Sequence, residues 1–142
     1  DLTWRQLMPR YAYLDSSAIV KLVVAEPETA SLERDLAARA GLFCSRLGAA
    51  EVLRAARRRS NRRVIQQTDD VLGVLVLMDV TAASLTRAAG LAPDDLRTLD
   101  AIQLATALSV GIADLDFLTY DDRLARAARA HGLDVFEPGA TV

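Results

Sequence analysis

The feature that most constrains the fold of this chain is an alternation of short apolar runs with longer helical segments. The short runs have the length and composition of buried strands. Strands that alternate with helices are typical of an α/β fold with a mainly parallel sheet. The expected strands are residues 11–14, 42–44, 76–80, 116–120 and 134–136.

Capping and stop residues predict where the helices begin and end. Ser16 or Ser17 is expected to cap the first helix, although residues 18–25 are rich in β-branched side chains and are also compatible with a strand. The clearest helix is "LRTLDAIQLATALSVG", which Thr98 is expected to cap and Gly111 to stop. The other predicted helices cover residues 28–40, 46–59, 64–74, 81–90 and 121–132.

Composition excludes several classes of protein. With about half its 142 residues hydrophobic and a quarter charged, the chain is typical of one folded domain, and we expect residues 1–142 to form it. No apolar run approaches the roughly 18–20 residues of a membrane-spanning helix. Because Cys44 is the only cysteine and no signal-peptide pattern is present, we expect a cytoplasmic location. Residues 1–9 are expected to be an N-terminal extension outside the core.

Acidic residues stand where predicted strands end and helices begin. Asp15 follows the first strand, Asp100 lies in the first turn of its helix, and Asp121 opens the helix after residues 116–120. In open α/β sheets, ligands bind beyond the carboxyl ends of the strands. These acids are therefore candidates for one shared site.

Each acid also has a purely structural interpretation. Asp100 can compensate the helix dipole, which is worth about 0.3–1 kcal/mol. Asp121 can be an ordinary N-cap, and Glu51 can pair with Arg54 in solvent. Position along the sequence alone does not separate these alternatives. The acids that could take the place of Asp121 are Asp114, Asp116 and Asp122.

The stretch "RAARRRSNRR", residues 54–63, holds six arginines and no acid. The simplest interpretation is a solvated helix end, where cations suit the negative pole of the dipole. The alternative is a patch that contacts phosphates. The net charge of −2 indicates no global preference for nucleic acid.

Four blocks together resemble the PIN domain, and within it the VapC toxins of bacterial and archaeal toxin–antitoxin pairs. They are "YLDSSAIVKL", Glu51 within "SRLGAAEVLRA", "LRTLDAIQLATAL" and "LTYDDRLARAA". The resemblance covers residues 11–136 and implies a three-layer α/β/α sandwich with a mainly parallel sheet. It also implies a ribonuclease site that depends on Mg²⁺ or Mn²⁺. One departure is Gln103, where many relatives carry His.

By this resemblance, the family's four acids fall on Asp15, Glu51, Asp100 and Asp121. Hydrolysis of a phosphodiester needs an activated water and stabilisation of negative charge, which hard divalent cations on carboxylates supply. We expect Asp15 and Asp100 to be the principal metal ligands. Glu51 and Asp121 are expected to bind a second ion or to ligate through water. The hydroxyl residues expected to orient the carboxylates are Ser17 and Thr119.

The resemblance further implies an RNA substrate, inhibition by a VapB-type antitoxin, and a homodimer. An acidic metal site beside a basic stretch favours the phosphate-contacting interpretation of the arginines. The residues expected to contact the RNA backbone are Arg54, Arg57, Arg58, Arg62 and Arg63.

Three other functions compete with this prediction. A phosphatase of the haloacid dehalogenase type needs a second acid two residues after the first, where this chain has Ser17. A phosphoacceptor receiver module needs a late lysine at a strand end, whereas Lys21 is the only lysine. A catalytically silent PIN fold that binds RNA or protein is the third alternative.

Overall fold

A computed structural model of the chain describes residue 8 and residues 10–140. The predicted N-terminal extension, residues 1–9, lies outside the described residues apart from Met8, which is exposed. In the described part, five parallel strands form one sheet in the order β3-β2-β1-β4-β5. The predicted parallel sheet is therefore confirmed. The strands are β1 (Tyr11–Leu14), β2 (Gly41–Ser45), β3 (Val76–Met78), β4 (Asp116–Leu118) and β5 (Asp134–Phe136).

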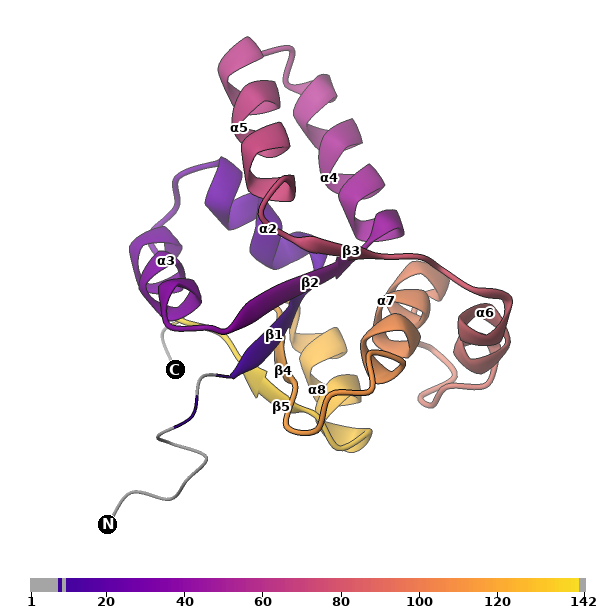
Figure 1. Cartoon of the computed structure of the whole chain (residues 1–142). Helices are drawn as coiled ribbons and strands as arrows, with labels where there is room; N and C mark the ends of the chain where they lie inside the picture. Colours follow the sequence, from indigo (N-terminus) through magenta and orange to yellow (C-terminus); the bar gives the residue numbers. More distant parts are fainter. Residues whose placement is uncertain (1–7, 9, 141–142) are drawn as a thin grey trace.

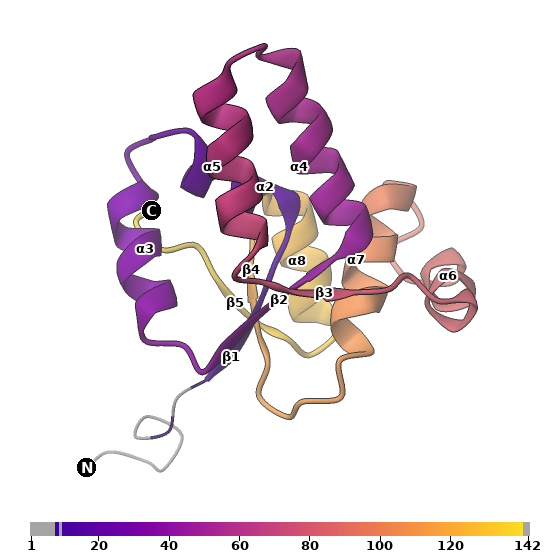
Figure 2. The ribbon, with the colours of Figure 1, turned by 45° about the horizontal axis from the view of Figure 1, so that its top comes forward.

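Helices cover both faces of the sheet, so the predicted three-layer α/β/α arrangement is also confirmed (Figures 1 and 2). Helices α2 to α5 pack on one face, α7 and α8 on the other, and α6 packs against α7. None of the helices described is long and apolar enough to cross a membrane. The helices are α2 (Ser16–Val23), α3 (Thr29–Ala37), α4 (Arg46–Arg58), α5 (Arg62–Leu72), α6 (Ala82–Ala89), α7 (Thr98–Leu108) and α8 (Asp122–Ala130).

Strand β1 lies at the centre of the sheet and is buried on both faces. Ala12 and Leu14 point into the core beneath α2 to α5, while Tyr13 points into the core beneath α7 and α8. The Tyr13 ring stacks on Phe117 of β4, with ring centroids 5.5 Å apart. Because side chains alternate along a strand, this short segment anchors both layers. The residue that follows β1 therefore has a rigid base.

Asp116 begins β4, so it lies at the amino end of the strand and cannot share the role of Asp121 beyond its carboxyl end. Its side chain is fully buried and accepts hydrogen bonds from Arg10 and Arg39. The sequence alternative that placed Asp116 in the site is therefore wrong. The amino and carboxyl ends of parallel strands lie on opposite sides of the sheet. This acid pairs with arginines on the side of the amino ends, away from the site.

Candidate active site

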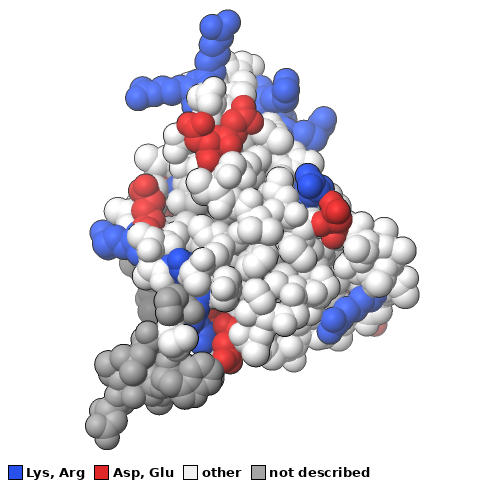
Figure 3. Space-filling model, in the orientation of Figure 1, with Lys and Arg blue, Asp and Glu red and all other residues white. Residues whose placement is uncertain are grey.

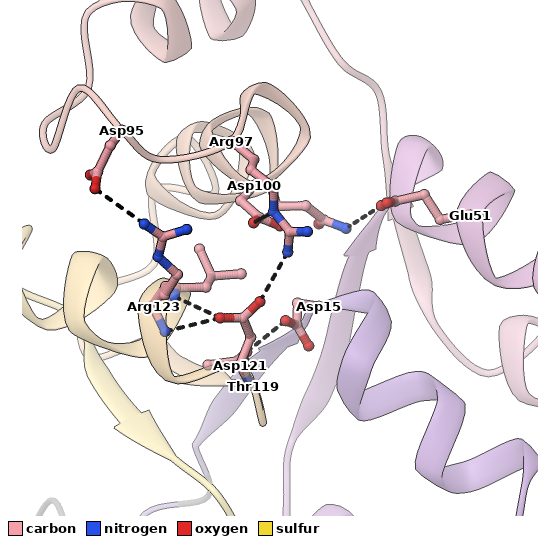
Figure 4. A network of polar contacts seen from close by, with 10 residues as sticks. Asp15, Glu51, Asp95, Arg97, Asp100, Thr119, Asp121 and Arg123 are labelled. Atoms are coloured by element: carbon pink, nitrogen blue, oxygen red, sulfur yellow. Dashed lines mark hydrogen bonds and ion pairs between the residues drawn. The ribbon is translucent and has the colours of Figure 1, made fainter.

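A pocket of about 490 Å³ opens at the carboxyl ends of β1 and β4. These two strands are neighbours: β2 and β3 continue the sheet on the side of β1, and β5 continues it on the side of β4. The carboxyl ends of β1 and β4 therefore form a topological switch point. Four acids from four separate segments face the pocket (Figure 4). They are the four predicted from the sequence, Asp15, Glu51, Asp100 and Asp121. The pocket is also lined by Ser17, Arg58 and Arg97.

Asp15 is the most deeply buried of these acids, with 3% of its surface exposed. One carboxylate oxygen accepts from the Ser17 hydroxyl at 2.6 Å and from the Ala18 amide at 3.0 Å. The other oxygen accepts from the Thr119 hydroxyl at 2.6 Å. The predicted roles of Ser17 and Thr119 thus have direct geometric support. Ser17 lies in the first turn of α2 and Thr119 directly follows β4, and their hydroxyls hold the same carboxylate.

The first helix is capped by Asp15, and not by Ser16 or Ser17 as the sequence suggested. Asp15 has the extended backbone of a residue that leaves a strand, and its side chain reaches the amide three residues on. Ser16 and Ser17 already lie within the helix. Since the cap uses only one of the two oxygens, the carboxylate can cap the helix and face the pocket together.

Burial raises the pKa of Asp15 to about 6, against the lowering effect of hydrogen bonds from Ser17, Thr119 and Ala18. The negative charge of Asp121 raises this pKa further. A carboxylate that is costly to ionise in its own environment is stabilised by a bound cation. The electrostatics at Asp15 therefore favour a site for a positive ion.

Without divalent cations, the free energy of unfolding is expected to decrease by about 1 kcal/mol between pH 5 and pH 7.5 because of Asp15. The folded-state pKa of about 6 lies above the ordinary 3.8, so the folded protein binds the extra proton. That stabilisation is fully present below the ordinary pKa and is lost as the pH rises through 6. Urea unfolding at several pH values in EDTA measures how the free energy of unfolding depends on pH, and Asp15→Asn should weaken this dependence. An equal pH dependence in both proteins would contradict the prediction.

Asp121 is both a helix cap and a pocket residue. One carboxylate oxygen accepts from the amides of Arg123 and Leu124 at 2.9 and 3.1 Å, which caps α8. The other oxygen accepts from Arg97 at 3.3 Å. The two interpretations of Asp121 are therefore compatible. Asp122 is exposed at the start of α8 and does not line the pocket.

Asp100 lies in the first turn of α7, with 20% of its side chain exposed. It accepts from the Arg97 guanidinium at 3.1 Å, so Arg97 joins Asp100 to Asp121 across two segments of the chain (Figure 4). The predicted cap at Thr98 is wrong, because Arg97 occupies the N-cap position and Thr98 is the first helical residue. Sequence reasoning missed Arg97, although an arginine three residues before a helical acid was an available signal.

Glu51 lies on α4 and is half-buried at the side of the pocket. Among the described residues no ion pair joins it to Arg54, so the solvated pair suggested by the sequence does not form. Its carboxylate instead accepts from the Gln103 amide at 3.3 Å. Desolvation raises the pKa of Glu51, the Gln103 hydrogen bond lowers it, and the charge of Asp100 raises it.

The chemistry of these donors fits a hard divalent cation. Carboxylate oxygens are the ligands that Mg²⁺ and Mn²⁺ prefer, and the pKa values of Asp15 and Glu51 are raised by burial and further by a neighbouring acid. Within residue 8 and residues 10–140, no three His, Cys, Asp or Glu side chains already converge closely enough to hold a metal. Arg97 instead provides the positive charge between Asp100 and Asp121.

The predicted basic residues divide into two groups. Arg58, near the end of α4, reaches the acidic pocket. The others are exposed without lining it, and Figure 3 shows basic side chains gathered at the end of the molecule where α4 and α5 join. The Asn61 side chain caps α5, which begins two residues earlier than predicted. This cap places Arg62 and Arg63 in the first helical turn.

Comparison with known proteins identifies sequence relatives along most of the chain. Residues 12–130 match the PIN domain family. Ribonuclease VapC46 of Mycobacterium tuberculosis is 44% identical over 132 residues, which cover 89% of this chain and 96% of that protein. Ribonuclease VapC47 of the same species is 34% identical and covers 90% of this chain and 97% of that protein.

Solved structures share the fold at lower sequence identity. The crystal structure of VapBC2 from Rickettsia felis, bound to a DNA fragment from its promoter, matches with a TM-score of 0.70 and 15% identity. It covers 89% of this chain and 97% of that chain. VapC20 of Mycobacterium tuberculosis, a toxin that cleaves the sarcin–ricin loop, matches with a TM-score of 0.65 and 18% identity, covering 86% of this chain and 95% of that chain.

Proposed function

Because this chain belongs to the PIN domain family and to its VapC group, we propose that it is a divalent-metal-dependent endoribonuclease. We further propose that it acts as the toxin of a toxin–antitoxin pair. The support for the activity is the 44% identity to a protein named a ribonuclease over nearly the whole length of both chains.

The observation that carries the proposal is the meeting of four acids at one pocket. A purely structural role would need no such convergence, since each acid could cap its own helix or be solvated on it. Here Asp15 and Asp121 each use one oxygen for a cap, while the other accepts from Thr119 and from Arg97, respectively, and both residues line the pocket. A set of carboxylates on several segments is the donor arrangement that metal-dependent nucleases require.

We assign Asp15 and Asp100 as the principal ligands of Mg²⁺ or Mn²⁺, with Glu51 and Asp121 as further ligands, directly or through water. The ion would activate a water molecule and stabilise negative charge on the scissile phosphate. Ser17 and Thr119 would keep the Asp15 carboxylate in place.

Arg97 is suited to contact the RNA phosphate beside these acids. Its side chain is 71% exposed, so it can leave Asp100 and Asp121 without losing a packed environment. In its present position it reduces the repulsion between the two carboxylates. We propose that it exchanges these acids for the phosphate when the substrate is bound.

The arginines at the junction of α4 and α5 are proposed to follow the RNA backbone toward the pocket. The helix dipole explains the cations at the end of α4, but it disfavours Arg62 and Arg63 in the first turn of α5. Those two charges therefore need another reason, and a phosphate contact supplies one. The proposed set remains Arg54, Arg57, Arg58, Arg62 and Arg63.

Replacing Arg58 and Arg62 by Gln is expected to reduce the salt dependence of RNA binding. Each phosphate contact that is lost should lower the slope of log affinity against log salt by about 0.7. Fluorescence anisotropy with single-stranded RNA measures this slope, with Asp100→Asn present in every protein to prevent cleavage. Arg129→Gln, an exposed arginine at the far end of α8, is the matched control. An unchanged slope for Arg58→Gln and Arg62→Gln would remove these residues from the RNA path.

The direct test of the proposed activity is cleavage of RNA with and without metal. We expect cleavage with added Mg²⁺ or Mn²⁺, loss of cleavage in excess EDTA, and recovery when the metal is restored, because the carboxylates alone cannot activate the water. The products are expected to carry a 5′-phosphate and a 3′-hydroxyl. RNA binding without cleavage under any metal condition would instead support the silent binding module.

Partners are proposed by analogy with the structural neighbours. A toxin–antitoxin complex from Klebsiella pneumoniae has the same fold, with a TM-score of 0.69 and 20% identity. We propose a VapB-type antitoxin for this chain and a homodimer in solution. A monomeric mass in light scattering would contradict the dimer, and unchanged cleavage in the presence of the cognate antitoxin would contradict the inhibition.

A further inference from the structure

A chain of buried hydrogen bonds leads from the sheet to Glu51 through Gln103. Gln103 lies on α7 and is 1% exposed. Its amide oxygen accepts from the Tyr13 hydroxyl of β1 and from the Ser45 hydroxyl, the latter at 3.1 Å. Its amide nitrogen donates to the Glu51 carboxylate at 3.3 Å. One side chain thus connects β1, the end of β2 and α4.

The orientation of the Gln103 amide is determined at its Glu51 end. The Ser45 oxygen accepts from the Gly48 amide at 2.8 Å as it caps α4, so its own hydrogen is available for Gln103. An ionised carboxylate can only accept, so the NH₂ group of Gln103 must face Glu51. The amide oxygen is then left for the two hydroxyls. Reversing the amide would place its oxygen against the Glu51 carboxylate, and that hydrogen bond would be lost.

The packing around Gln103 is adapted to this amide. A Cβ atom at Gly48 would lie 2.5 Å from the Gln103 amide nitrogen and 2.9 Å from the Cys44 sulfur. Glycine is otherwise disfavoured within a helix, and here it lies in the first turns of α4, three residues before Glu51. The close approach of the amide therefore explains the glycine.

We propose that Gln103 is a positioning residue that holds the Glu51 carboxylate toward the metal-binding pocket, with Tyr13 and Ser45 as its anchors. This inference rests on the proposed metal-dependent function. Tyr13 and Ser45 restrain the amide from inside the core, while Glu51 is the only one of the four connected side chains that lines the pocket. The rigidity of the sheet is thereby transferred to an acid on a helix.

A neutral imidazole would provide the same hydrogen-bond polarity at this position. One ring nitrogen can accept from the hydroxyls while the other donates to Glu51. Methionine has a similar volume to glutamine but lacks the amide donor. The pair Gln103→His and Gln103→Met therefore separates hydrogen bonding from side-chain volume.

Calorimetric titration with Mn²⁺ tests the inference without relying on activity. Gln103→Met is expected to raise the Mn²⁺ dissociation constant about tenfold, and Gln103→His less than about threefold. The Mn²⁺ concentration that half-saturates cleavage should rise in parallel, with a smaller change in kcat at saturating metal. Thr106→Val is the matched control, because it removes a different buried side-chain donor on α7, a hydroxyl that donates to the Ile102 carbonyl and not to Glu51. It should leave Mn²⁺ affinity unchanged.

The outcomes distinguish this inference from the proposed function. If the unaltered protein binds no Mn²⁺ and cleaves no RNA, the proposed function fails. If it does both and Gln103→Met binds Mn²⁺ equally well, the positioning role is overturned. The positioning role is also overturned if Thr106→Val or Gln103→His weakens Mn²⁺ binding as much as Gln103→Met does. Should Gln103→Met not fold, Tyr13→Phe replaces it, because it removes one anchor and must also weaken Mn²⁺ binding.

Discussion

Replacing Asp100 by Asn is expected to lower the rate of metal-dependent RNA cleavage by about 10²–10³-fold. The substitution keeps the size of the side chain but removes a charge from the proposed metal ligands. Asp100 is the most suitable of the four acids for this test, because its side chain is 20% exposed and pairs with the exposed Arg97. The folded structure should therefore tolerate the change. Initial rates at fixed Mg²⁺ or Mn²⁺ measure the effect.

The matched control is Asp122→Asn. Asp122 is also an aspartate in the first turn of a helix beside the pocket, but it is exposed and does not line it. Its replacement should change the rate by less than about twofold, since surface substitutions usually have small effects. Cleavage by Asp100→Asn within threefold of the unaltered protein, with both variants folded, would contradict the assignment of Asp100 as a metal ligand.

Replacing Asp116 by Asn is expected to lower the free energy of unfolding by about 3 kcal/mol. The carboxylate is fully buried and pairs with Arg39, which is only 7% exposed, and with Arg10. Without it, two cations lose their buried partner, although Arg39 retains Asp35 at 3.0 Å. Urea or guanidinium unfolding measures the loss. Cleavage per folded molecule should be unchanged, because Asp116 lies at the opposite edge of the sheet.

Asp79→Asn is the control for this stability effect. Asp79 also pairs with an arginine, Arg46, but both side chains are exposed to solvent. Exposed pairs contribute at most about 1 kcal/mol, so we expect a change of less than about 0.5 kcal/mol. If Asp116→Asn is no more destabilising than Asp79→Asn, burial does not make the Asp116 pairs important for stability.

Local patterns were sufficient to predict most of the architecture. The five strands and the helices between them follow from apolar runs, caps and glycines, which act within a few residues. The boundaries were less accurate where two neighbouring residues could perform the same task. Asp15, Ser16 and Ser17 can all cap a helix. The extended backbone of Asp15, which makes it the N-cap, cannot be read from the sequence.

Asp15, Asp100 and Asp121 could also be selected from the sequence, because they stand at junctions that converge beyond the carboxyl ends of a parallel sheet. Glu51 joined them only through the resemblance to the PIN domain. The partners of these acids could not be selected from the sequence. Arg97 reaches Asp121 across 24 positions, and Tyr13 reaches Gln103 across 90 positions. Such contacts depend on how the helices pack on the sheet, and this packing cannot be predicted from local sequence patterns. For the same reason, Gln103 looked like a minor departure from its relatives and not like a residue that contacts Glu51.

The sequence by itself therefore determined the α/β class, the order of the elements and the acids at their junctions, because these depend on hydrophobic periodicity and capping over short distances. Tertiary structure decided which side chains share the pocket and which do not. It placed Glu51 at the pocket and within hydrogen-bond distance of Gln103, and it placed Asp116 at the amino ends of the strands, away from the pocket. Strand order and helix packing set these distances, and they arise only when the whole sheet is assembled.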